Sequence, residues 1–276
     1  MFNTRTIPAV VAAGLAAIYL TYIWRLGDTA HWGMSLIFGA AISSLLWDKR
    51  ATTLNPQTAA TGLGAVLVAA ILALSLPLSD SETFIRLMPL LCGFAVALLA
   101  AGFQGFSIYR QELMLLFFLG VPRVIFSLIQ DISPITARFS AFLLWYVGYD
   151  PTVDGVFLRL GSQAIRVWEG CSGAESICYM LGIAAVCLML FPIKGRTFQI
   201  AAVSVAALLG FVVNAIRVSF LAVLVMRDNF DAFVYWHEGD GSLLFGTGSV
   251  ALFGLLYWVV SSQLLQDQSI SSSSPK

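Results

Sequence analysis

A cysteine, an arginine and a histidine in the second half of the chain have the side-chain types that acyl transfer through a thioester requires. Cys171 lies in "EGCSGAES", at the start of an apolar run, where a helix N-terminus favours the thiolate. Arg217, in "NAIRVSFLAVL", could direct several N–H donors at a developing oxyanion. His237, in "HEGDGSLLF", titrates in the range of a general acid or base. These three residues are the candidate nucleophile, oxyanion donor and proton shuttle.

Each of these residues also has a non-catalytic interpretation, which the residues alone leave open. Cys171 could pack as a small apolar side chain, Arg217 could be a snorkelling or ion-paired arginine, and His237 could be an exposed loop histidine. Asn214, three residues before Arg217, and Glu175, four after Cys171, have the spacing of one helical face. For Glu175 we favour a structural ion pair over a catalytic role, because a carboxylate beside a thiol would raise the thiol pKa.

The composition is that of a membrane protein. Of 276 residues, 59% are hydrophobic and 11% are charged, whereas soluble domains carry roughly 25% charged residues. The net charge of zero gives no reason to expect a nucleic-acid partner. The four cysteines lack metal-site spacing, so we expect no metal and no organic cofactor.

Long apolar blocks predict an all-α polytopic membrane protein with about eight transmembrane helices. A spanning helix needs about 20 mostly apolar residues. The candidate segments are residues 7–24, 31–47, 59–78, 87–103, 112–129, 174–191, 198–225 and 242–265. We expect one integral membrane domain over residues 1–265, with the catalytic motifs in 155–250. The low-complexity residues 266–276 are expected to be a disordered tail.

The polar stretch before Cys171 predicts structure outside the bilayer core. "ITARFSAFLLWYVGYD" has polar ends and predicts an interfacial or re-entrant helix. "GVFLRLGSQAIRVWEG" alternates apolar and polar residues about Gly161 and Ser162, which indicates a small hairpin. This hairpin would deliver the chain to Cys171.

The distribution of Lys and Arg favours both termini on the inner side of the membrane. With eight spans, the short loops carry six basic residues on the side of the N-terminus and three on the other. Positive charge is retained inside. The orientation is therefore N-in and C-in, with Cys171 on the extracytoplasmic side of the membrane.

The three quoted motifs, in this order, resemble the exosortase/archaeosortase family of polytopic cysteine transpeptidases. The resemblance covers about residues 155–250 and implies Cys171 as nucleophile, Arg217 as oxyanion stabiliser and His237 as acid and base. Archaeal members typically have arginine where His237 stands, which favours the bacterial exosortase branch. Glu238, next to His237, is taken as a supporting residue together with Glu175 and Asn214.

The resemblance also implies a substrate class. Family members process proteins whose C-terminus carries a short motif (often Pro-Glu-Pro), a transmembrane helix and a basic cluster. They pass the new C-terminus to an acceptor, often in bacteria that make exopolysaccharide, and act within membrane lipid. Two alternatives remain: a transporter with a charge pathway through Arg217, Glu175 and Arg123, and a non-catalytic assembly factor. Ala174 and Glu175, after Cys-Ser-Gly, depart from many relatives, and the sequence names neither sorting motif nor acceptor.

Overall fold

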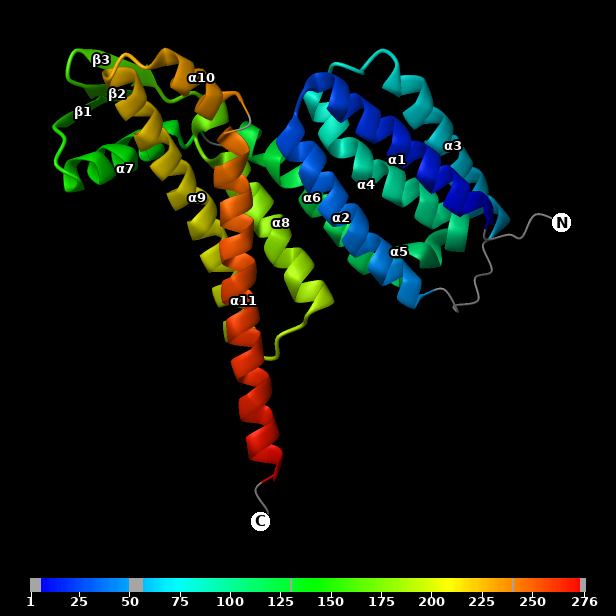
Figure 1. Ribbon diagram of the computed structural model, residues 1–276. Helices are drawn as coiled ribbons and strands as arrows, with labels where there is room; N and C mark the ends of the chain where they lie inside the picture. Colours follow the sequence, from blue (N-terminus) through cyan, green and yellow to red (C-terminus); the bar gives the residue numbers. More distant parts are fainter. Residues whose placement is uncertain (1–5, 50–56, 130, 240, 274–276) are drawn as a thin grey trace. The chain divides into compact units, whose positions relative to one another are not determined.

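The computed structural model describes residues 6–49, 57–129, 131–239 and 241–273. The chain forms two compact units, Met1–Ile125 and Phe126–Lys276, and each is described by itself (Figure 1). The single membrane domain over residues 1–265 stays a prediction. The boundary falls inside helix α6 (Arg110–Ile129), shortly after Gly120, Pro122 and Arg123.

The first unit is a bundle of helices. Its elements are α1 (Thr6–Leu26), α2 (Thr29–Asp48), α3 (Thr58–Ser75), α4 (Glu82–Ala101), the short turns η1 (Gly102–Gln104) and α5 (Gly105–Ile108), and most of α6. Helix α4 packs against both α1 and α3. Gly64 of α3 lets that helix approach α4 closely, because a Cβ there would lie 3.0 Å from the backbone oxygen of Ala95.

Ion pairs tie the helices of this unit together. Lys49, after α2, pairs with Glu112 of α6 at 2.7 Å. Arg86 of α4 pairs with Asp28 at 3.3 Å and with Glu82 at 2.9 Å. Arg86 and Glu112 are buried, and a buried charge is tolerated when it is paired.

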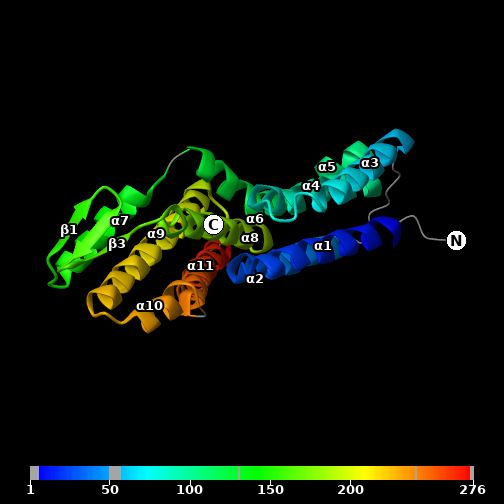
Figure 2. The same ribbon diagram turned by 90° about the horizontal axis from the view of Figure 1, so that it is seen from above.

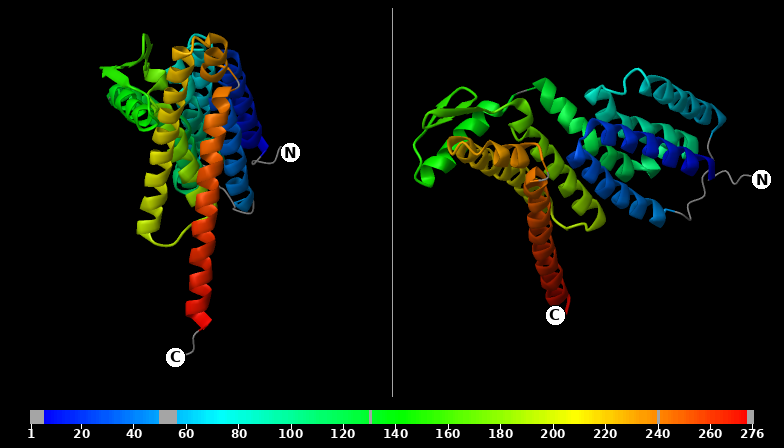
Figure 3. Two further views of the ribbon diagram at one scale, coloured as in Figure 1. Left: turned by 60° about the vertical axis from the view of Figure 1, so that its left-hand side comes forward. Right: turned by 45° about the horizontal axis from the view of Figure 1, so that its top comes forward.

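The second unit combines long helices with a small sheet. Its elements are α7 (Ser133–Tyr146), β1 (Pro151–Asp154), β2 (Phe157–Leu160), β3 (Gln163–Arg166), η2 (Glu169–Cys171), α8 (Ala174–Leu190), α9 (Arg196–Met226), α10 (Phe230–His237) and α11 (Gly241–Ser273). Helices α8, α9 and α11 pack together. The sheet, α7 and α10 gather at the end where α8 starts and α9 finishes (Figures 1 and 3).

The sheet and α7 match the structure expected before Cys171. Strands β2 and β3 form the predicted hairpin about Gly161, which has a φ of 62°. Strand β1 adds a third, antiparallel strand that the sequence did not indicate. Helix α7 and the sheet lie beside α9 (Figure 2). Leu158 and Leu160 of β2 share a buried cluster with Leu144 of α7 and Val218 of α9.

The helices confirm the predicted all-α polytopic class. All eight apolar segments are helical, and in the described ranges six helices are long and apolar enough to cross a membrane: α1, α2, α3, α4 with its continuation to Ile108, α9 and α11. Helix α8 is apolar but shorter. Helix α11 extends to Ser273, and the disordered tail over residues 266–276 stays a prediction.

Candidate active site

Three elements of the second unit bring the predicted catalytic residues together. Cys171 ends the 3-10 turn η2, Arg217 lies in the last third of α9, and His237 is the last residue of α10. Asn229 accepts a hydrogen bond from the amide of Ala232 at 3.2 Å and thereby caps the start of α10. The chain thus turns back and lays α10 against α9.

Cys171 and His237 are in direct contact. The Sγ atom lies 3.2 Å from Nε2 of the imidazole, within reach for proton transfer. The ring of Phe233 stacks on the imidazole, with centroids 5.0 Å apart and an angle of 14° between the planes. Phe233 was not predicted from the sequence, although its position four residues before His237 on a helix would have indicated the contact.

The turn at Cys171 explains the Cys-Ser-Gly sequence. Ser172 Oγ donates to the carbonyl of Glu169 and closes the turn. Gly173 has a φ of 90°, and a Cβ there would lie 2.9 Å from the Asn214 amide nitrogen. Only glycine meets both requirements. The close approach lets Asn214 Nδ2 donate to the carbonyl of Cys171 at 2.8 Å.

Helix α7 fixes the same turn from the other side. The fully buried Thr136 donates its hydroxyl hydrogen bond to the carbonyl of Ser172. Ser140 donates to the carbonyl of Ala215 at 3.1 Å, which holds α7 on α9 near Asn214. No sequence pattern indicated Thr136, because it lies 36 residues from its partner. Asn214 and Thr136 together fix two successive carbonyls of the nucleophile's turn.

Arg217 is anchored beside the Cys–His pair. Its Nη2 donates to the backbone carbonyl of His237 at 2.8 Å. Among the residues that the structure describes, its buried Nε has no hydrogen-bond partner and the guanidinium makes no ion pair. One nitrogen of the planar group is thus committed to holding α10, and another donor remains available.

The two candidate carboxylates have different surroundings. Glu238 Oε1 lies 3.5 Å from His237 Nδ1, at the long limit of a hydrogen bond, and this side chain is 75% exposed. Glu175 accepts a hydrogen bond from the hydroxyl of Tyr179 at 2.9 Å, one turn along α8. Of the two, Glu238 is the carboxylate whose charge acts on both members of the Cys171–His237 pair.

Burial keeps the pair uncharged at rest. It raises the pKa of the Cys171 thiol; the Arg217 charge opposes this shift and Glu238 reinforces it. Burial also lowers the pKa of His237, as does Arg217, while Glu238 opposes that shift. Both shifts due to burial favour the neutral form of the group. Cys171 itself lies in η2, before α8 begins at Ala174.

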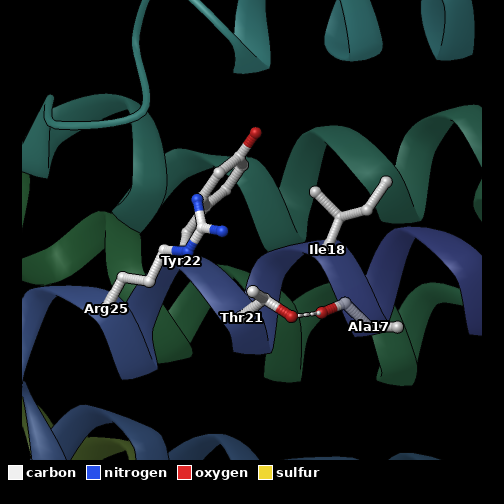
Figure 4. Close-up of a pocket in the computed structure, with 5 residues that line it drawn as sticks. All are labelled: Ala17, Ile18, Thr21, Tyr22 and Arg25. Atoms are coloured by element: carbon white, nitrogen blue, oxygen red, sulfur yellow. Dashed lines mark hydrogen bonds between the residues drawn. The ribbon is translucent and has the colours of Figure 1, made fainter.

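A small cavity of about 30 Å³ adjoins Cys171 and His237, between β3, α9 and α10. A wider, open hollow of about 310 Å³ lies along α1 in the other unit, lined by Ala17, Ile18, Thr21, Tyr22 and Arg25 (Figure 4). The hydrogen bond at this hollow lies within α1, where the Thr21 hydroxyl donates to the carbonyl of Ala17. Within the described ranges, no group of three or more His, Cys, Asp or Glu could hold a metal ion. The candidate reactive groups at the smaller cavity are the thiol of Cys171 and the imidazole of His237.

Comparison with known families identifies the family of this chain. The family model of the transmembrane exosortases matches residues 9–254, most of the chain, so the protein belongs to that family. No curated protein and no solved structure matches the chain. Family membership confirms the resemblance carried by the three motifs and supports a membrane-bound transpeptidase that processes other proteins.

Proposed function

We propose that this transmembrane exosortase is a cysteine transpeptidase whose acyl-enzyme is a thioester on Cys171. Its substrates would be proteins with a C-terminal sorting motif, a transmembrane helix and a basic tail. The observation that carries the proposal is the 3.2 Å contact between the Cys171 thiol and the His237 imidazole, with Arg217 bonded to the backbone of that histidine. A nucleophile, a base and a cationic donor therefore meet in one site.

The first step is attack on the substrate carbonyl. Cys171 Sγ bonds to the carbonyl carbon while its proton moves to Nε2 of His237. Nδ1 then carries the second ring proton and faces the carboxylate of Glu238, 3.5 Å away. The Phe233 ring fixes the plane of the imidazole.

The developing oxyanion requires a donor, and Arg217 is the candidate. The guanidinium lies close enough to lower the pKa of Cys171 against the effect of burial, so it also acts on negative charge that passes from the sulfur to the carbonyl oxygen. The hydrogen bond to the carbonyl of His237 holds the fork in place before the substrate arrives. Such preorganised donors are typically worth about 10²–10³ in rate.

The imidazolium then protonates the leaving amine, and the C–N bond breaks. The thioester remains on Cys171 until an acceptor amine or water attacks it, with His237 as the base. The leaving fragment would be the C-terminal helix and tail of the substrate. An amine acceptor would give transpeptidation, and water would give hydrolysis.

We also propose a multi-pass position in the inner membrane, with both termini inside and the site outside. Helices α8 and α11 start at the site end of the second unit, and α9 finishes there, so these helices alternate in direction (Figure 1). If the site is outward, a membrane-impermeant maleimide labels Cys171 in right-side-out vesicles faster than in inverted ones. The reverse order would place the site on the inner side.

The test of function compares cells that carry the parent chain with cells that carry Cys171→Ala. Mass spectrometry of membrane-protein C-termini should find proteins shortened by a C-terminal helix in the first cells and intact in the second. Cys187→Ala is the matched control, since it changes another cysteine of the same unit. Identical sets of C-termini in the parent and Cys171→Ala cells would refute the proposal.

A further inference from the structure

The cavity beside Cys171 has room for about one small group. Its volume is about 30 Å³, whereas a cavity needs about 10–15 Å³ to hold one water molecule. The Cys171 and His237 side chains form part of its wall. A group that enters the cavity therefore lies next to the reacting atoms.

The rest of the wall is mainly apolar. It consists of side chains from β3 and the segment after it, α9 and α10, namely Ile165, Val167, Val218, Leu221 and Phe233. Arg166 also lines the cavity, but its guanidinium carbon lies 4.1 Å from the ring centroid of the exposed Trp168. The Arg166 charge therefore contacts the exposed Trp168 ring at the protein surface, and the aliphatic part of the side chain can cover the apolar wall.

Arg217, the candidate oxyanion donor, is not part of this wall. An oxyanion inside the cavity would face mainly apolar side chains, and burying charge among them is costly. An apolar substituent of the substrate is a better occupant. The cavity and the oxyanion donor thus serve different parts of a substrate bound at Cys171.

We propose that the cavity receives the side chain of the substrate residue whose carbonyl Cys171 attacks, and that it selects a small apolar side chain such as that of alanine. The proposal rests on acyl transfer at Cys171. A side chain branches one carbon away from the attacked carbonyl, which must lie about 3–3.5 Å from the sulfur. It is therefore confined to the immediate surroundings of Sγ.

The walls make the selection strict. Val218 and Leu221 are 2% and 3% exposed, so a larger group must displace packed residues of α9. Glycine would leave the cavity unfilled and lose its contacts. One methylene more or fewer in an apolar pocket changes the specificity constant by about 10–200-fold.

Activated esters test this selection without knowledge of the natural substrate. The probes are 4-nitrophenyl esters of N-acetylglycine, N-acetylalanine, N-acetylvaline and N-acetylphenylalanine, applied to the full chain in lipid nanodiscs. Sγ bonds to the acyl carbon, the ester C–O bond breaks and 4-nitrophenolate leaves, while the thiol proton passes to His237. The nitrophenolate burst and the mass added to Cys171 measure acylation, with Cys171→Ala as the blank.

We expect the alanine ester to acylate the parent fastest, with the valine and phenylalanine esters slower by about tenfold or more. Val218→Ala widens the cavity and should raise the rate with the valine ester relative to the alanine ester by about tenfold. Val225→Ala is the matched control: it is the same change in α9, also at a buried position, but away from the cavity. Leu221→Val is a second widening variant should Val218→Ala not accumulate.

The outcomes separate the two proposals. Acylation of the parent at equal rates by all four esters would overturn the selection and leave the thiol chemistry standing. An equal change in Val225→Ala and Val218→Ala would likewise overturn it, because selectivity would then not arise from the cavity. If no ester acylates Cys171, the proposed function fails, and the selection fails with it.

Discussion

Replacement of Arg217 by lysine tests the oxyanion role most directly. The guanidinium commits Nη2 to the carbonyl of His237 at 2.8 Å, while its buried Nε has no partner among the described residues. A lysine places its donors on a single nitrogen, so it cannot hold the carbonyl and reach a separate oxyanion with the same planar fork. We expect Arg217→Lys to lower the acylation rate by about 10²–10³, or about 2.7–4 kcal/mol of barrier.

Two reactions of the same thiol isolate this effect. Acylation by the alanine ester passes through an oxyanion, whereas alkylation by iodoacetamide at an sp³ carbon develops none. Arg217→Lys should therefore slow acylation by the stated factor and leave alkylation within about tenfold of the parent, since the positive charge that acts on the thiol is retained. Arg196→Lys, the same change at the exposed start of α9, should alter neither rate.

The result can contradict the reasoning in two ways. Equal acylation by Arg217→Lys and the parent would show that the charge alone suffices and that no forked donor is used. Equal losses in acylation and alkylation, or a failure of the variant to accumulate in the membrane, would show that Arg217 acts by holding α10 and His237 in place. Only a loss confined to acylation supports an oxyanion donor.

Three further predictions follow from the site. Replacing Cys171 by alanine should abolish ester acylation and substrate processing. Alanine at each of the other cysteines, Cys92, Cys178 and Cys187, should preserve both. Retained activity in Cys171→Ala would end the thiol mechanism. Gly173→Ala should cost about 1–3 kcal/mol of strain and slow acylation, because Gly173 has a φ of 90° and lies close to Asn214. Thermal unfolding of this variant measures the strain, and Gly246→Ala, at an open helical position, is the control. Burial raises the pKa of Cys171 and Glu238 adds to the shift, so iodoacetamide alkylation should have its pH midpoint above about 8.5. Glu238→Gln should lower that midpoint, and an unchanged midpoint would remove Glu238 from the site.

Much of the fold was predictable because bilayer helices are marked by long apolar runs. All eight runs are helices. The hairpin was predictable from alternation about Gly161. Strand β1 was not, since its four residues begin with a proline and pack only partly. The division at Ile125 was not predicted either, because the apolar run of α6 continues on both sides of Gly120, Pro122 and Arg123.

The site was predictable in its residue types but not in its contacts. Cys171, Arg217 and His237 stood out as polar groups near span ends, and the structure brings them together. Helical spacing suggested that Glu175 shares a face with Cys171. That rule does not apply, because α8 begins at Ala174 and Cys171 belongs to the preceding turn.

The charges around the site indicate when the thiolate forms. Arg217 lowers the pKa of both Cys171 and His237, whereas Glu238 raises both. Transfer of a proton from the thiol to the imidazole depends on the difference between these two pKa values. Arg217 favours the transfer by lowering the thiol pKa and disfavours it by lowering the imidazole pKa. Glu238 has the two opposite effects. Burial instead raises the first and lowers the second, and therefore disfavours the charged pair. In the proposed mechanism the driving force therefore comes from the substrate: once negative charge passes from sulfur to the carbonyl oxygen, Arg217 would stabilise it there, and the imidazolium would persist until the amine leaves.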